Sequence, residues 1–94
     1  MRTTERSTAF RRDFKRAKAN PRNRDFETLL NEVIAALASD AVLPGRLMDH
    51  PLSGPWIGYR DCHVKPDLVL VYRKSGADLL ELVRLGTHSE LFRK

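Results

Sequence analysis

The sequence predicts an α+β fold in which a helical hairpin packs on one face of a small antiparallel sheet, with the elements in the order β-α-α-β-β-β. Apolar residues recur with a helical period in the first half of the chain and with a strand-like period after Gly54. The connections in the second half are short, as hairpins between antiparallel strands require. A chain of 94 residues can build one core between two packed layers, so we expect one domain over residues 1–94.

Two amphipathic segments predict the helices. The first helix is expected over residues 8–20, where Asn20-Pro21 should end it. Its apolar side is formed by Phe10, Phe14 and Ala17. The second helix is expected over residues 24–38, and its apolar residues follow the spacing i, i+3, i+4, i+7: Phe26, Leu29, Leu30, Val33, Ile34 and Leu37.

Three segments in the second half have the composition of strands, at residues 56–64, 68–73 and 78–85. The middle segment is apolar on both faces, as a central strand should be. Turn signals at Pro66 and Ser75-Gly76 separate the three. A weaker signal predicts a short first strand near the start of the chain, at residues 3–7.

Counting residues from the predicted turns places polar side chains opposite one another. If residues 64–66 close the first hairpin, His63 faces Asp67 at hydrogen-bonding distance. If Ser75-Gly76 forms the tip of the second hairpin, Asp67 also stands opposite Arg84. We therefore expect these three side chains to line one end of the sheet, although a register slip of one residue would separate them.

The charge of the chain is strongly basic and unevenly distributed. Seventeen Lys and Arg against twelve Asp and Glu give a formal net charge of +5. The excess is concentrated in residues 1–24. Such a surface attracts either a phosphate backbone or an acidic protein partner, and the charge alone does not distinguish the two.

The composition argues against a secreted or membrane-bound protein. Cys62 is the only cysteine, so no internal disulfide can form, and we expect it to be a small buried apolar residue. The chain starts without an apolar signal segment and has no apolar run long enough to span a bilayer. We expect a cytoplasmic protein with no membrane partner.

All three histidines lie in the second half, each within a short polar motif. His50 follows Asp49, His63 stands three residues before Pro66, and His88 follows Gly86-Thr87. Imidazole exchanges protons near neutral pH, so several histidines on turn-rich connections indicate acid–base chemistry. A single histidine is more often a hydrogen-bonded structural group than a catalyst. The longer motifs around the histidines must therefore distinguish a catalytic role from a structural one.

Four such motifs occur at residues 49–54, 56–67, 70–72 and 84–92. They are Asp49-His50-Pro51-Leu52-Ser53-Gly54, Trp56-Ile57-Gly58-Tyr59-Arg60-Asp61-Cys62-His63-Val64-Lys65-Pro66-Asp67, Leu70-Val71-Tyr72 and Arg84-Leu85-Gly86-Thr87-His88-Ser89-Glu90-Leu91-Phe92. In this combination and spacing the chain resembles the YafQ branch of the RelE/ParE toxin superfamily. The N-terminal half agrees with that branch only in helical pattern and basic charge. The resemblance implies a RelE-like fold and a toxin of a type II toxin–antitoxin pair.

The resemblance also implies an activity and its residues. Toxins of this branch are endoribonucleases that enter the ribosomal A site and cut messenger RNA there, which inhibits translation. By motif position, the catalytic residues would be His50, His63, Asp67 and His88, and the RNA-binding residues would be Arg84, Phe92 and Lys65. YafQ-like chains commonly have Trp after the Pro-Asp pair, whereas this chain has Leu68, so a stacking role at that position is not carried over from the family.

The partners implied are an acidic antitoxin of the DinJ/RelB type, the 70S ribosome and messenger RNA. An antitoxin segment would fold on the basic surface as it binds. Operator DNA would be reached only indirectly, through the antitoxin.

The implied reaction fits these residue types. Attack by the 2′-hydroxyl of RNA on the adjacent phosphate needs a base, an acid for the departing 5′-oxygen and positive charge around the phosphorus. His50 or Asp67 could be the base and His88 the acid, with Arg84 and protonated His63 balancing charge. Asp67 could instead orient His63, and the residues alone do not choose between these roles.

Two other classes of function remain open at this point. Three histidines and one aspartate could form a tetrahedral zinc site, although their spacing is not a known zinc motif and the 2′-hydroxyl reaction needs neither metal nor cofactor. A non-catalytic binding toxin of the ParE type would share the fold, and the histidine set argues against it.

Overall fold

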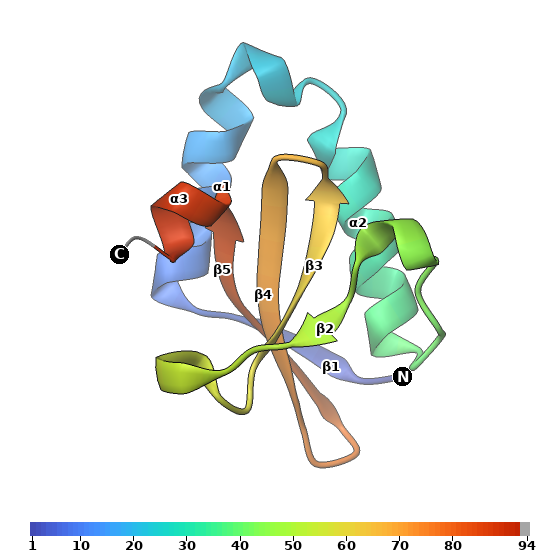
Figure 1. The fold of residues 1–94 in the computed structure, drawn as a ribbon. Coiled ribbons are helices and arrows are strands. Elements are labelled where there is room, and N and C mark those ends of the chain that lie inside the picture. Colours follow the sequence, from blue (N-terminus) through green and yellow to red (C-terminus); the bar gives the residue numbers. More distant parts are fainter. Residues whose placement is uncertain (93–94) are drawn as a thin grey trace.

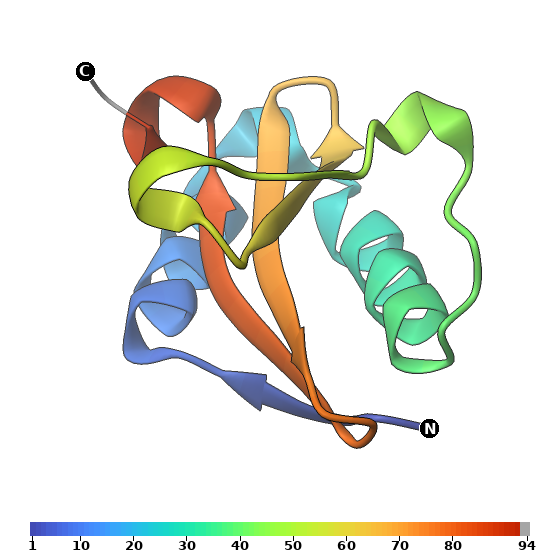
Figure 2. The ribbon, with the colours of Figure 1, turned by 60° about the horizontal axis from the view of Figure 1, so that its bottom comes forward.

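The helices α1 (Thr8–Ala19) and α2 (Phe26–Ala38) pack on the same face of a five-stranded sheet in the computed structural model, which describes residues 1–92 (Figure 1). Figure 2 shows this layer of helices behind the sheet, while the segment that carries β2 crosses the opposite face. No described helix is long and apolar enough to span a membrane. The strands are β1 (Thr3–Arg6), β2 (His50–Pro51), β3 (Arg60–Lys65), β4 (Leu68–Ser75) and β5 (Leu79–Gly86).

The sheet has the order β1-β5-β4-β3-β2 and is mixed, not purely antiparallel. The predicted meander is confirmed, since β3, β4 and β5 pair antiparallel. The predicted first strand also exists, but β1 pairs parallel with β5, so the expectation of an all-antiparallel sheet was wrong at this edge. A hairpin does not join these two strands, because almost the whole chain lies between them, so their direction is free of the hairpin constraint.

The strand predicted to start at residue 56 starts only at Arg60. Residues Gly54–Trp56 form a short 3₁₀ helix, and Gly58 adopts a φ of 93°, which a strand does not accept. A further strand that the sequence did not predict, β2, is only two residues long and places His50 opposite Asp61 of β3.

The predicted register at the site end of the sheet was wrong in both hairpins. The first turn lies at Pro66 and Asp67 and not at residues 64–66, so Asp67 belongs to the turn and faces no residue of β3. Val64 is an extra residue that bulges from β3, which shifts the register once more and pairs His63 with Val69. In the second hairpin Arg84 pairs with Val71. The turn there lies at residues 76–78, beyond the predicted tip, and β5 carries its own bulge between the paired positions.

The main core lies between the helices and the sheet. Phe10 of α1 and Leu30 of α2 are 1% exposed, and they pack with Leu70 of β4 and Leu82 of β5, which are fully buried. Full burial of each such side chain stabilises the fold by about 1.5–3 kcal/mol. Ser7 caps α1 by accepting a hydrogen bond from the backbone N–H of Phe10.

A buried carboxylate, Asp13, ties α1 to β5. The side chain of Asp13 accepts hydrogen bonds from Arg84 Nε (2.7 Å) and Nη2 (3.2 Å), from the backbone N–H of Leu85 (2.9 Å) and from Arg16 Nη2 (2.9 Å). Burial by itself raises the pKa of Asp13, but the hydrogen bonds from Arg84 and Leu85 and the charges of Arg84 and Arg16 together bring the pKa below its ordinary value. The carboxylate is therefore ionised and fully partnered inside the protein.

Replacing this carboxylate should destabilise the fold. Asp13→Ala leaves the Arg84 guanidinium and the Leu85 N–H without their acceptor, so the free energy of unfolding should fall by about 3 kcal/mol. Urea denaturation measures this change. Glu32→Ala removes an exposed carboxylate from α2 and should stay within about 0.5 kcal/mol of the parent. Equal stability of the two variants would contradict the structural role given to Asp13.

Candidate active site

The face of the sheet opposite the helices carries a second, smaller apolar cluster. Its buried members are Val69 and Val71 of β4 and Leu91 of the last helix. The partly buried side chains packed around them come from the β2–β3 connection, β5 and the C-terminal segment: Leu52, Trp56, Tyr59, Val83 and Phe92. We call this side of the sheet the open face.

Successive side chains of β3 point to opposite faces of the sheet, and polar residues among them point to the open face. Cys62 and Val64 belong to the main core, so Asp61 and His63 point to the other side of the sheet. Cys62 is a buried free thiol, as predicted, and burial raises its pKa to about 12. A thiol of this kind is not a nucleophile at neutral pH.

The motif Gly86-Thr87-His88 forms the start of α3 (His88–Leu91). The Thr87 hydroxyl accepts a hydrogen bond from the backbone N–H of Glu90, and the Glu90 carboxylate accepts one from the N–H of Thr87, so the two form a capping box. A side chain at Gly86 would meet Glu90 Oε1 at 2.8 Å. The glycine thus lets α3 fold close against the end of β5, which places His88 at the first helical position.

The structure brings two of the predicted catalytic residues and the predicted aromatic together. The rings of His63 and His88 lie 5.3 Å apart, measured between centroids. The ring of Phe92 packs edge-on against His88 at 5.4 Å, and Trp56 packs edge-on against Phe92 at 5.7 Å. The aromatic chain thereby anchors the C-terminal segment over the open face.

Two of the histidines have one ring nitrogen occupied. His50 Nδ1 lies 2.6 Å from the carbonyl oxygen of Met48, and His63 Nδ1 lies 3.2 Å from the carbonyl oxygen of Pro66. A carbonyl only accepts, so in the neutral ring Nδ1 carries the proton and Nε2 has the free lone pair. Both rings therefore present a basic nitrogen away from their backbone contacts.

Asp61 is a member of this site that the sequence analysis missed. It is 1% exposed and pairs with His50 across the β2–β3 edge. Burial raises its pKa, and the charges of His50, His63 and His88, when these are protonated, oppose that rise. Its position two residues before His63 on a strand was a usable signal, because residues i and i+2 share a face.

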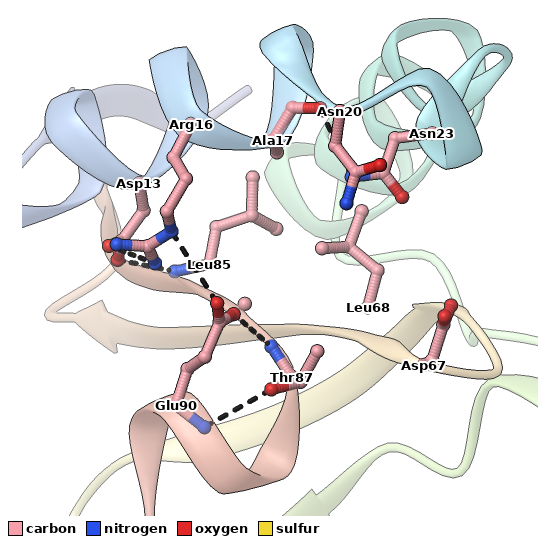
Figure 3. Close-up of a pocket in the computed structure, with 11 residues that line it drawn as sticks. Asp13, Arg16, Ala17, Asn20, Asn23, Asp67, Leu68, Leu85, Thr87 and Glu90 are labelled. Atoms are coloured by element: carbon pink, nitrogen blue, oxygen red, sulfur yellow. Dashed lines mark hydrogen bonds and ion pairs between the residues drawn. The ribbon is translucent and has the colours of Figure 1, made fainter.

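Asp67 does not make the contact predicted for it. It lies exposed in the β3–β4 turn, and among the described residues its carboxylate has no hydrogen bond to His63. Figure 3 shows Asp67 at one end of a cavity of about 70 Å³, with Asp13 and Arg16 at the other end and Leu68 between them. Its predicted position opposite Arg84 was also wrong, because the β5 bulge and the longer turn shift that register.

The predicted RNA-binding cations Arg84 and Lys65 already have partners in the fold. Arg84 donates two hydrogen bonds to Asp13, and Lys65 Nζ donates one to the carbonyl oxygen of Arg22 at 3.0 Å. Each keeps further donors. Their role toward RNA stays a prediction.

Aromatic side chains near the site divide between the core, where Tyr72 lies, and the edge of the open-face cluster, where Tyr59 lies. Tyr72 is 1% exposed, and its hydroxyl donates to Asp49, which also receives Arg60 Nε at 3.2 Å. Burial, with the hydrogen bond to Asp49, raises the pKa of Tyr72 far above its ordinary value, so it stays protonated. Tyr59 lies under the guanidinium of Arg73, 4.8 Å from the ring centroid.

The residues described, 1–92, contain no group of three or more His, Cys, Asp or Glu side chains arranged to hold a metal ion. The histidines lie close enough to share a charge environment, as their common effect on Asp61 indicates, but they do not converge as ligands.

The family described as a bacterial toxin of a type II toxin–antitoxin system, YafQ, matches residues 2–93. An mRNA interferase toxin YafQ of Escherichia coli K12 is 38% identical over 98% of this chain and 97% of its own length. Among solved structures, an E. coli DinJ–YafQ complex has a chain that is 39% identical, with a TM-score of 0.83 over 98% of this chain and 99% of the other. A metal-bound toxin from Helicobacter pylori is 45% identical, with a TM-score of 0.86 over 98% of this chain and 100% of the other.

The ring hydrogen bonds predict which nitrogen carries the proton in each neutral histidine. In ¹⁵N-correlated NMR spectra recorded at high pH, His50 and His63 should both show a protonated Nδ1 and an unprotonated Nε2, because a carbonyl oxygen holds each Nδ1–H. His50→Gln and His63→Gln assign the signals. A protonated Nε2 in either ring would contradict the geometry at that histidine.

Proposed function

Because the chain belongs to the YafQ family of toxins from type II toxin–antitoxin systems, we propose that it is an mRNA interferase that cleaves messenger RNA in the ribosomal A site and thereby inhibits translation. The curated relatives matched over nearly their full length are named mRNA interferase toxins. The family match covers all of the elements that build the open face.

The observation that best supports a nuclease is the gathering of imidazoles on the open face. His63 and His88 come from β3 and α3 and approach to 5.3 Å, while His50 joins them from β2 through its contact with Asp61. Three proton-exchanging groups from three separate elements serve acid–base catalysis well. Phe92, 5.4 Å from His88, offers an aromatic surface on which a base of the RNA can stack.

In the proposed reaction the 2′-hydroxyl of one nucleotide attacks the adjacent phosphorus. His50 Nε2 takes the hydroxyl proton as the 2′-oxygen bonds to phosphorus, and His88 gives a proton to the 5′-oxygen as the P–O5′ bond breaks. The products are a 2′,3′-cyclic phosphate and a 5′-hydroxyl. Asp67 remains an alternative base, since it is exposed and free to approach the RNA.

Positive charge for the crowded phosphorus would come from Arg84 and protonated His63. Arg84 uses Nε and one Nη2 hydrogen to bind Asp13, which leaves its Nη1 group for a phosphate. The Asp13 contact also fixes the direction of the guanidinium, so little conformational freedom is lost on binding.

Ribosome binding would use the basic face of α1. Arg11, Arg12, Lys15 and Lys18 are all exposed there, away from the core-facing side of the helix. Closely spaced cations of this kind bind a phosphate backbone without reading its sequence.

The cognate antitoxin would be an acidic, partly disordered protein of the DinJ/RelB type that neutralises the toxin by covering part of this basic surface. A related toxin forms a DinJ–YafQ complex in crystals, and its chain aligns with this one over 98% of the length. The antitoxin would also carry the toxin to operator DNA.

Cleavage on translating ribosomes should depend on the histidines. Expressed in a bacterial host, the parent chain should arrest growth and give primer-extension stops at fixed codon positions only when the message is translated. His88→Ala and His50→Ala should each slow cleavage by about 10²- to 10⁴-fold, because each removes a proton-transfer group. Glu32→Ala, on the far side of α2, should behave as the parent.

Other outcomes have definite meanings. Arrest without cleavage would replace the nuclease with a non-catalytic ParE-type toxin, and unchanged cleavage by both histidine variants would remove the assigned roles.

Removal of metal should leave the nuclease active. Cleavage of ribosome-bound message, after a rapid exchange into EDTA with spermidine to keep the ribosome intact, should proceed at the untreated rate because 2′-hydroxyl attack needs no metal. Loss of activity that Zn²⁺ restores would instead support the histidines as metal ligands.

A further inference from the structure

Asp61 is the least satisfied buried polar side chain on the open face. It is 1% exposed, yet neither carboxylate oxygen accepts a hydrogen bond of good geometry among the described residues. His50 Nδ1 lies 3.2 Å from Oδ1 of this carboxylate. That nitrogen makes the shorter approach to the carbonyl oxygen of Met48, at 2.6 Å, so the contact with Asp61 is an ion-pair distance and not a well-formed hydrogen bond.

Asp13 shows, by contrast, that a buried carboxylate with a structural role in this protein receives a full set of hydrogen bonds. Asp13 is 2% exposed and receives four hydrogen bonds. Asp61 is as deeply buried and receives none. An unpartnered buried carboxylate costs several kcal/mol, so a protein that carries one has a use for its charge.

The charged groups around Asp61 identify that use. The groups that act on it are His50 and Asp49 from the β2 segment, His63 on its own strand and His88 from α3, while the paired position on β4 is the apolar Val71. Three of these four groups are imidazoles of the proposed nuclease site. Attraction between the carboxylate and a ring grows when that ring gains a proton.

We propose that Asp61 is a positioning residue of the nuclease, an anchoring carboxylate that holds His50 and stabilises the positive charge that His50 acquires when it takes the 2′-hydroxyl proton. The inference rests on the proposed function. The proton moves from the 2′-oxygen to Nε2, the ring becomes an imidazolium, and the Nδ1 side of the ring lies against the Asp61 carboxylate. After His88 has given its proton to the 5′-oxygen and the products have left, His50 releases its extra proton to water and His88 takes one from water, which returns both rings to their starting states.

This role requires the negative charge and not merely the shape of the side chain. Asp61→Asn keeps the shape and removes the charge, so kcat for cleavage of ribosome-bound message should fall by about 10²-fold while KM stays within about twofold. Thermal unfolding should show the variant at least as stable as the parent, because burial of an ionised carboxylate is removed. The matched control is Asp25→Asn, an exposed aspartate at the start of α2 whose side chain makes no cap hydrogen bond.

A double-mutant cycle gives the sharpest test. If Asp61 acts through His50, Asp61→Asn should cost about 10²-fold in the parent and less than about threefold in a His50→Ala background. Equal losses in both backgrounds, or a parental rate for Asp61→Asn, would overturn the inference while leaving the nuclease in place. Absence of cleavage by the parent chain would overturn the proposed function and the inference together.

Folding failure is also decisive. Should Asp61→Asn fail to fold, Asp61→Ser takes its place in the same cycle, since the smaller hydroxyl leaves room for a water molecule. Failure of both variants to fold would assign Asp61 to the fold and overturn the positioning role.

Discussion

Three hydrogen bonds from Arg84 and Leu85 to the buried carboxylate of Asp13 join the first helix to the last long strand, a fourth comes from Arg16 of the helix itself, and the geometry of the open face follows from this junction. They hold Arg84 and the backbone of Leu85 at the point where β5 has just passed its bulge. The strand then ends at Gly86, where α3 turns back closely enough to form its capping box. The position of the His88 ring beside His63 therefore depends on the contact between α1 and the end of β5.

The two faces of the sheet differ in whether a buried carboxylate has hydrogen-bond partners. On the helix side, the single buried charge of α1 is fully partnered and lowers the free energy of the fold. On the open face, Asp61 is buried without a hydrogen bond beside three imidazoles, which is costly for stability. Such a division is expected where one face is selected for packing and the other for chemistry, because a site that must stabilise a transient charge cannot neutralise it in advance.

The sequence predicted the fold well where a pattern extends over many residues. Both long helices start and end within about two residues of the prediction, since amphipathic periods and the Asn20-Pro21 stop are local signals. The parallel pairing of β1 with β5 and the bulges in β3 and β5 produce no periodic pattern in the sequence, so they were not predicted. For the site, the structure brings His63, His88 and Phe92 together, whereas the predicted pairing of Asp67 with His63 and Arg84 failed because both turns lie further along the chain than predicted and each hairpin also carries a bulge.

The parallel pairing of residues 3–6 with residues 79–82 also constrains how the chain is made. A ribosome delivers the N-terminal strand first, and this strand has no partner strand until residues 79–82 have been translated. Contacts between such distant residues raise the contact order, so the last folding step waits for a long loop to close. His88 is itself beyond β5. A nascent chain consequently holds no assembled set of imidazoles until both β5 and α3 have been synthesised and have folded.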